Sequence, residues 1–598
     1  MNVPRTCRRA SIASSSLLCV LIVILATVSY MRSWSVHAET KPNRSTPAAA
    51  PDTVPAAAES YVGAAACAPC HQQIYSTFER TRMGRSMTLV TPALLKTLSL
   101  PGSFYSQTLD RHFEVFARNG KLYQSEYAVG PDAKEIFRNT KQIDWIIGAG
   151  ANGIGGLTIE GNALFEAPLS FYPRTNQWEL SPGYEMNDLG FHRPVLPGCI
   201  ACHTGRSNLV DQTTSRFTVK PFDQPSIGCE NCHGPGEAHV RAETTHQGLD
   251  AGSHIVNPGR LSADLENNIC MSCHEAGDSR VPRPGKNYQD FRPGEPLDKA
   301  VSVFMVPLKK SDPDTHDHVQ HFFEMSMSKC YRATAGQLRC ATCHNPHFEP
   351  APEKASAYFN QKCMACHADR QCTLPQADRA KTSPADNCIG CHMPHRDAPE
   401  TAHTSLTNHR ILKRPGEPWP NEAFKQTTPA LPDLVHIDAV PRQSDQIPAA
   451  TLVEAYREIA SRRPEYQEKY EQTLAQAQTA LPGDAAVQLD LGRISLARDQ
   501  PAEAVTYLQR AATLSPNDPA AFGYLSQALS RVGRVHEAIA ASRKAVELDP
   551  FEPLWRKGLI DQYITAQQYS DATLAMKQYL DQFPEDGSMR KIYEFATH

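Results

Sequence analysis

The stretch Cys199-Ile200-Ala201-Cys202-His203 has the form Cys-x-x-Cys-His, and the chain contains six more stretches of this form. They lie at 67–71, 229–233, 270–274, 340–344, 363–367 and 388–392. Two thiols at this spacing can reach the two vinyl groups of one porphyrin edge, and the histidine that follows can bind the iron. With 18 Cys and 23 His in 598 residues, chance would produce roughly 0.02 such stretches. The pattern therefore predicts seven covalently attached haems c.

This prediction assigns a role to each motif residue. The attachment cysteines are Cys67, Cys70, Cys199, Cys202, Cys229, Cys232, Cys270, Cys273, Cys340, Cys343, Cys363, Cys366, Cys388 and Cys391. The proximal iron ligands are His71, His203, His233, His274, His344, His367 and His392. Zinc ribbons and disulfides also use paired cysteines, but neither requires a histidine after every second cysteine. A disulfide between the two cysteines left over in this region, Cys330 and Cys372, stays open.

The N-terminal segment is typical of an exported protein. Arg5, Arg8 and Arg9 precede an apolar run at 17–28, and Val36-His37-Ala38 suits signal cleavage. Residues 1–38 are therefore a signal peptide or, since 12–31 is long enough to span a bilayer, an uncleaved anchor in the inner membrane. Either way we expect a periplasmic or otherwise extracytoplasmic protein. Residues 39–60, rich in Pro and Ala, predict a linker.

The sequence from residue 61 onward predicts two parts of different architecture. All seven motifs lie within 61–412, which we expect to form a heptahaem cytochrome c domain, and a Pro-rich linker follows at 413–448. Residues 449–598 carry a repeat, because Pro448, Pro482, Pro516, Pro550 and Pro584 are 34 residues apart. That is the period of tetratricopeptide helix pairs, which stack into an α-solenoid. We expect small residues such as Gly492 to lie where two helices approach closely.

The fold class we expect is mainly α, with short helices and loops around stacked haems. The exception is residues 100–185, where short apolar runs alternate with Gly and Pro and predict a small β-rich insertion. Within it, Asn119-Gly120 between two apolar segments predicts a type I′ hairpin turn.

The sixth ligand of each iron separates electron carriage from chemistry at an open site. We expect distal ligation by His239, His347, His395, His403 and His409, with His192 and His321 as further candidates. In Cys343-His344-Asn345-Pro346-His347, a proline turn directs His347 away from the haem of its own motif, so we expect His347 to bind the iron of a neighbouring haem. No histidine follows the first motif closely, and Met83 or Met87 is the candidate there; a core methionine is the alternative.

The chain resembles multihaem cytochromes c with a C-terminal tetratricopeptide domain, distantly related to the pentahaem nitrite reductase and octahaem hydroxylamine oxidoreductase group. The resemblance lies in Tyr61-Val62-Gly63, 81–87, 228–239, 342–347 and 391–395. It implies haems stacked as a conduit. The Cys-x-x-Cys-Lys motif of the nitrite reductases does not occur in the sequence.

We therefore expect an electron-transfer protein with no catalytic residue, whose repeats dock a redox partner protein. The alternative is a haem-dependent oxidoreductase that acts on a small nitrogen or sulfur compound at one five-coordinate haem, the first being the leading candidate. A net charge of −4 gives no sign of nucleic-acid binding.

Overall fold

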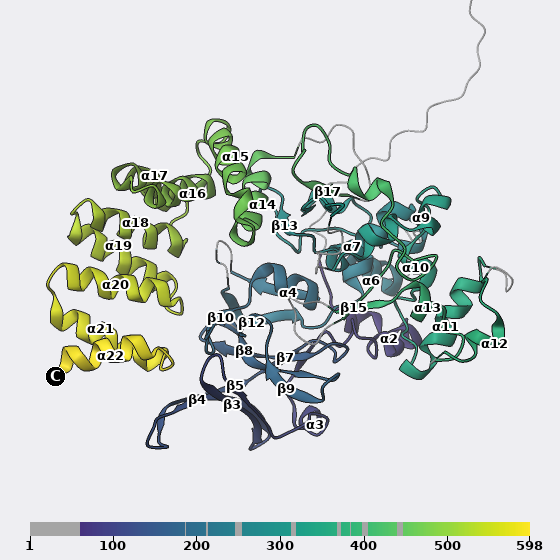
Figure 1. The fold of residues 1–598 in the computed structure, drawn as a ribbon, viewed down its shortest axis with the longest axis horizontal. Helices are drawn as coiled ribbons and strands as arrows, with labels where there is room; N and C mark the ends of the chain where they lie inside the picture. The colour runs from purple at the N-terminus through teal and green to yellow at the C-terminus, as the bar shows by residue number, and fades with distance from the viewer. Residues whose placement is uncertain are drawn as a thin grey trace, which may run out of the picture. The chain divides into compact units, whose positions relative to one another are not determined.

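Two antiparallel sheets fill the interval between the first and second motifs (Figure 1). The computed structural model describes residues 60–185, 187–210, 213, 215–245, 254–311, 319–367, 372–382, 384–397, 405–438 and 447–598. One sheet has the order β2 (Gly102–Ser106), β3 (Arg111–Arg118), β4 (Lys121–Val129) and β5 (Glu135–Ile143). The other has the order β1 (Met87–Leu89), β6 (Trp145–Ile147), β7 (Ile154–Glu160), β8 (Ala163–Tyr172) and β10 (Arg193–Pro194), and β9 (Gln177–Leu180) pairs with β8.

The hairpin predicted at Asn119-Gly120 is confirmed. β3 pairs with β4 in a register that sets Arg118 opposite Lys121, and both turn residues have positive φ, 53° and 73°. A type I′ turn requires this conformation at both positions. Inward-facing side chains such as Val115 and Leu122 are fully buried, so the strands meet in an apolar core.

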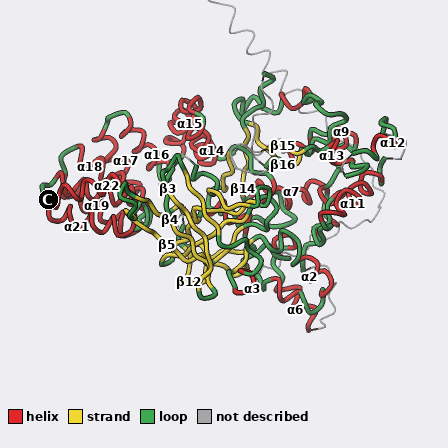
Figure 2. The backbone as a smooth tube through the Cα atoms, turned by 60° about the horizontal axis from the view of Figure 1, so that its bottom comes forward, coloured by secondary structure: helices red, strands yellow, loops and turns green. Residues whose placement is uncertain are grey.

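The motif region contains more strands than we expected. Three further sheets lie in it: β11 (Arg206–Leu209) with β12 (Phe217–Gln224); β13 (Ser279–Pro282) with β14 (Val301–Met305) and β17 (Val435–Ile437); and β15 (His395–Asp397) with β16 (Ser405–Thr407). The sheet that contains β1 and β10 also extends beyond the predicted limits of 100–185 on both sides. Figure 2 shows strands running through the middle of the chain, so "mainly α" is wrong for this half.

The helices of the motif region are short, and most motifs lie on one. They are η1 (Ala64–Cys67), α2 (Gln72–Phe78), α3 (Pro92–Leu95), α4 (Pro197–His203), α5 (Glu230–His233), α6 (Glu237–Thr245), η2 (Pro258–Arg260), α7 (Ala263–His274), η3 (Leu297–Lys299), α8 (His321–Ser326), α9 (Lys329–Ala333), α10 (Cys340–Cys343), α11 (Pro352–Met364), α12 (Gln376–Arg379), α13 (Cys388–His392) and η5 (Asn421–Phe424). A helical turn sets residues i and i+3 on one face, so both thiols of a motif point to the same side.

Residues 449–598 form the predicted stack of helices, drawn from green to yellow in Figure 1. They are α14 (Ala449–Arg462), α15 (Gln467–Ala480), α16 (Ala485–Ala497), α17 (Pro501–Leu514), α18 (Pro519–Arg531), α19 (Val535–Leu548), α20 (Pro553–Thr565), α21 (Tyr569–Gln582) and α22 (Gly587–Thr597). The acidic residue two places after each of the last four repeat prolines, for example Asp484 and Asp518, caps the next helix through its side chain. A Cβ added at Gly492 would lie 2.4 Å from Leu508, which confirms the predicted close approach.

The two halves share a core, which the sequence did not suggest. Val281, Phe304 and Leu434 pack in one buried cluster with Tyr456 and Ile459 of α14. Residues 413–438, predicted as linker, are folded here: β17 pairs with β14, and Leu434 and Val435 are buried. Proline content misled the prediction because these prolines flank short buried runs. Residues 59–598 form one compact unit.

The last turns of the solenoid contact the strand-rich insertion. The Phe583 and His192 rings lie 4.4 Å apart, and the Phe551 and Phe165 rings 5.3 Å apart. Beside them, the Arg111 side chain donates a hydrogen bond to the Glu585 carbonyl at 3.1 Å. Arg111 Nε also lies 3.1 Å from Asp188 Oδ2 and 3.6 Å from Glu126 Oε1.

This contact buries more carboxyl groups than it can neutralise. Burial raises the pKa of Glu126 well above the ordinary 4.5, and the nearby Asp188 and Glu585 carboxylates raise it further. A carboxyl group whose folded-state pKa is raised contributes stability below its unfolded pKa, and this stability is lost as the pH rises toward the folded value. The contact should therefore weaken as the pH rises from about 4.

Replacing Glu126 by glutamine tests this pH dependence. The variant keeps the shape but cannot ionise, so its free energy of unfolding should match that of the unmodified protein near pH 4 and exceed it at about pH 8. Denaturant unfolding followed at both pH values measures the difference. Glu114→Gln on the same hairpin is the control, because the half-buried Glu114 carboxylate pairs with Arg138 at 2.8 Å and its neutralisation should not raise the free energy of unfolding at pH 8. A deficit that is the same at every pH would contradict the assignment.

No helix in the described part of the chain is both long and apolar enough to cross a membrane. The predicted signal or anchor at 1–38 lies outside the described residues.

Candidate haem-binding sites

Four motif histidines face a second histidine from a distant part of the chain. The ring centres are 6.4 Å apart for His71 and His239, 6.0 Å for His233 and His347, 6.3 Å for His344 and His409, and 5.4 Å for His274 and His321. The first two pairs and the last are stacked within 20° of parallel. Two imidazoles on opposite sides of one metal ion, each with its nitrogen about 2 Å away, have ring centres about 6 Å apart. The donor sets therefore fit axial ligands of a haem iron.

Five of these imidazoles are neutral, which is the protonation state in which histidine binds a metal. Burial lowers the pKa of His274, His321, His344 and His347, and it lowers the pKa of His409 to about 4, so these imidazoles are neutral.

Backbone carbonyls also orient several of the rings. His233 Nδ1 donates to the Val256 carbonyl at 2.8 Å, and His392 Nδ1 donates to the Leu412 carbonyl at 2.5 Å. His409 Nδ1 donates to the Thr407 carbonyl at 2.9 Å. Such bonds leave Nε2 with its lone pair and fix the plane of the ring.

The first motif does not have the surroundings that we expected. The imidazole opposite His71 belongs to His239 on α6, which is a further candidate for that position beside Met83. Met87 is 2% exposed and packs with Leu157 and Phe217 in an apolar cluster, as a core methionine does. Met83 stays a prediction, and His239 was not considered for the first motif because only residues close to it in sequence were compared.

Four of the rings form a continuous run. His321 and His409 lie 4.2 Å apart, between His274 on one side and His344 on the other. Two sites built from these residues would therefore touch through their distal ligands.

Two buried carboxylates on or beside α8 position this run. Glu275 Oε2 accepts hydrogen bonds from the backbone N–H groups of Phe322 and Phe323, at 2.8 and 3.3 Å, and so holds the start of α8 beside His321. Glu324 Oε2 accepts from the backbone N–H of His409 at 2.8 Å. Sequence reasoning missed both glutamates. A charged residue directly after a motif, as Glu275 is, was the available signal.

The other predicted ligands are placed as follows. His395 Nδ1 is 3.3 Å from the Thr407 hydroxyl, and His403 lies outside the described residues. His192 packs against Phe165 and Phe583 at the end of the solenoid. His203, His367 and His392 are not among the four pairs. Cys330 and Cys372 are both free thiols, so the structure contains no disulfide between them.

Thiols of different motifs lie close enough to shift one another's pKa. A hydrogen bond with the Cys229 thiol raises the pKa of Cys67, and one with Cys273 lowers the pKa of Cys202 to about 5. A third such bond, with Cys340, lowers the pKa of Cys270.

Other thiol pairs interact only through their charges, and they show which further motifs are neighbours in space. Burial and then the nearby Cys270 raise the pKa of Cys232 to about 12. Burial and then the thiols of Cys388, Cys343 and Cys330 raise the pKa of Cys363 to about 11. The motif at 229–233 thus adjoins those at 67–71 and 270–274. The motif at 270–274 adjoins those at 199–203 and 340–344, and the last three motifs follow one another.

Comparisons with known proteins agree with a cytochrome. Residues 182–234, which include the second and third motifs, match the family model described as cytochrome c554 and c-prime. A stretch of 181 residues is 25% identical to the multiheme cytochrome MtrA of Shewanella baltica (strain OS185). This match covers 29% of the chain and spans about half, 53%, of that relative. Part of the chain is thus similar to multihaem cytochromes.

A short stretch near the C-terminus matches a different family model. Residues 522–552 match the tetratricopeptide repeat model. Similar solved structures include two of MamA, one of them from Desulfovibrio magneticus RS-1, at 17% and 18% identity and TM-scores of 0.22 and 0.21. Each covers 23% of this chain, and the shared part is 81% and 78% of those chains. TM-scores this low do not establish a shared fold.

Proposed function

We propose that the chain is an exported c-type cytochrome with seven covalently attached haems that carries electrons between protein partners. When bound, the haems supply one-electron transfer. The observation that carries the proposal is the set of four histidine pairs, because an iron with imidazole on both sides has no position left for a substrate. We assign His239, His347, His321 and His409 as the distal ligands of the motifs they face.

The contacts between motifs support a branched order. The path runs from 67–71 through 229–233 and 270–274 to 340–344, 363–367 and 388–392, and the motif at 199–203 joins it at 270–274. Such an order gives the chain three ends at which electrons can be exchanged. The first motif is one of these ends.

The tetratricopeptide half is proposed to dock a redox partner protein, because stacked helix pairs present an extended binding surface. Residues 1–38 are proposed as the export signal or membrane anchor, which would place the haem region in the periplasm.

Low-temperature electron paramagnetic resonance of the oxidised full-length protein tests the proposal, together with the intact mass. We expect a mass increase of seven haems and low-spin ferric signals throughout. A high-spin ferric signal in stoichiometric amount would indicate an open iron and favour the oxidoreductase alternative. Fewer than seven haems would show that some motifs are not attachment sites.

A further inference from the structure

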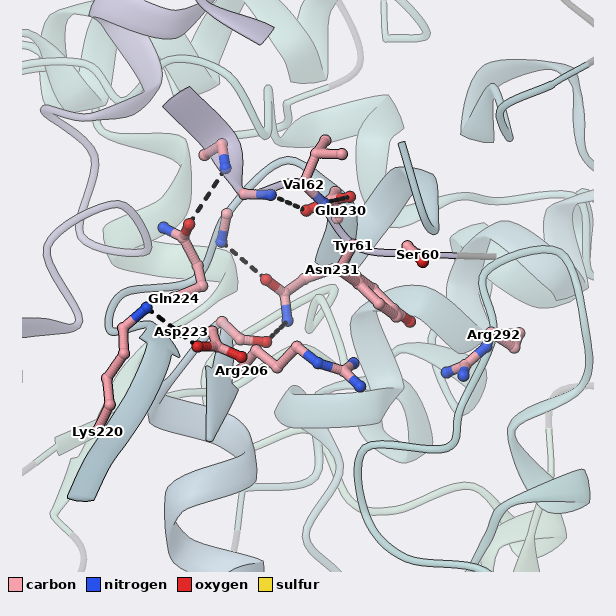
Figure 3. A pocket seen from close by; sticks show the side chains of 14 residues that line it. Ser60, Tyr61, Val62, Arg206, Lys220, Asp223, Gln224, Glu230, Asn231 and Arg292 are labelled. Atoms are coloured by element: carbon pink, nitrogen blue, oxygen red, sulfur yellow. Dashed lines mark hydrogen bonds and ion pairs between the residues drawn. The ribbon is translucent and has the colours of Figure 1, made fainter. Parts of the chain in front are cut away.

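A cavity of about 550 Å³ lies beside the third motif, between segments that are distant in sequence (Figure 3). Its walls come from residues 60–64, from 205–206 directly after the second motif, from β12 and the turn that follows it, and from Glu230 and Asn231 within the third motif. Arg292 closes the opposite side. This volume is in the usual range for small-molecule sites.

Several polar side chains in the wall are already satisfied. Glu230 accepts from the backbone N–H groups of Val62 at 3.0 Å, Gly63 at 2.8 Å and Gly236 at 2.8 Å. Asn231 binds the N–H of Gly228 and the carbonyl of Gly205, at 2.8 and 3.0 Å. These bonds make the wall a preformed frame that does not depend on a ligand.

The polar groups of the cavity that are still free to bind a ligand are mostly hydrogen-bond donors. The guanidinium groups of Arg206 and Arg292 approach the Tyr61 ring from two segments, with their central carbons 4.1 and 5.5 Å from the ring centre. Among the described residues neither guanidinium has a carboxylate within 4 Å, and Arg292 uses one nitrogen, Nη1, to donate to the carbonyls of Gln289 and Phe291 at 3.1 and 3.4 Å. Lys220 pairs with Asp223 at 3.1 Å, so three cations face two carboxylates, and both carboxylates are engaged.

The tyrosine contributes a further donor. Burial raises the pKa of Tyr61, although both arginines act in the opposite direction, so the hydroxyl stays protonated at neutral pH.

We propose that this cavity binds a small free anion with several oxygens, such as a polycarboxylate or a phosphate compound, between Arg206 and Arg292. Two planar guanidinium groups suit the paired oxygens of carboxylate and phosphate. No motif cysteine or histidine lines the cavity, so it is not the space for a porphyrin ring. Because Glu230 and Asn231 belong to the third motif, the bound anion would lie directly beside a haem attachment site.

Isothermal titration of the full-length haem-loaded protein with citrate, inorganic phosphate and sulfate tests this proposal. We expect one site for citrate or phosphate whose affinity falls as salt rises. The double variant Arg206→Gln with Arg292→Gln should bind at least tenfold more weakly. Arg118→Gln, in which an arginine that lies over Tyr123 at 4.8 Å is replaced, is the matched control and should bind as the unmodified protein does.

Absence of binding of all three anions to the unmodified protein would overturn the proposal, and this measurement does not depend on how any variant folds. The proposal would also be overturned if the double variant bound equally well. If the propionates of a neighbouring haem hold the two arginines, the unmodified protein will not bind the anions and the double variant will shift a haem reduction potential. That outcome would reject a free anion as the occupant.

Discussion

Replacing His239 by alanine should convert one ferric haem per chain from low spin to high spin. The ring centre of His239 lies 6.4 Å from that of His71, a spacing that fits a pair of axial ligands of one iron. Its removal leaves the first iron without its sixth ligand, since Met87 is buried in an apolar cluster. Electron paramagnetic resonance of the oxidised protein measures the change.

Two further variants sharpen this test. His239→Met should keep the iron six-coordinate but raise its reduction potential, because a Met/His pair favours the ferrous state relative to bis-histidine ligation. Met83→Ala should change neither the spin state nor the potentials. His536→Ala is the control for loss of a histidine, since His536 is exposed on α19 of the repeat region. A high-spin signal from Met83→Ala, and none from His239→Ala, would restore the methionine as the ligand.

Replacing Ile459 by alanine should destabilise the motif region, although the residue lies in α14, the first helix of the repeats. Ile459 is 1% exposed and packs in the cluster that contains Phe304 and Leu434. Removing such a buried side chain costs about 2–5 kcal/mol. Because the core is shared, denaturant unfolding followed by haem absorption and by far-ultraviolet circular dichroism should shift together.

The matched control is Ile564→Ala on α20, where the side chain is 41% exposed and the expected loss is within about 0.5 kcal/mol. Truncation after residue 448 should have a larger effect, since it removes α14 and exposes Val281 and Phe304. If the haem absorption of Ile459→Ala unfolded at the same denaturant concentration as that of the unmodified protein, the two halves would be independent.

Much of the architecture could be predicted from local pattern. The 34-residue spacing of Pro448 and its successors reports a unit that repeats, and each repeat contacts mainly its neighbours. The type I′ turn depends on Asn119 and Gly120 alone, because these two residue types tolerate positive φ. Neither feature requires knowledge of distant contacts, and both are confirmed by the structure.

The haem motifs and their proximal histidines were predicted in the same way, since covalent attachment needs two thiols and an imidazole within five residues. The distal histidine that faces each proximal histidine could not be predicted from such a local pattern. His71 faces His239, and His233 faces His347, across long stretches of chain that the fold brings together. Nearness in sequence favoured Met83, and that criterion has no physical basis for a long-range contact.

The sequence alone therefore determined the class of cofactor, its number of attachment motifs and the repeat half, because each depends on residues within one turn or one repeat. Only the tertiary structure decided which histidines face each other, that the first repeat shares the core of the haem region, and that Arg206 and Arg292 meet at one cavity. These features depend on packing between segments far apart in the chain, which is set by the burial of whole apolar surfaces rather than by any single motif.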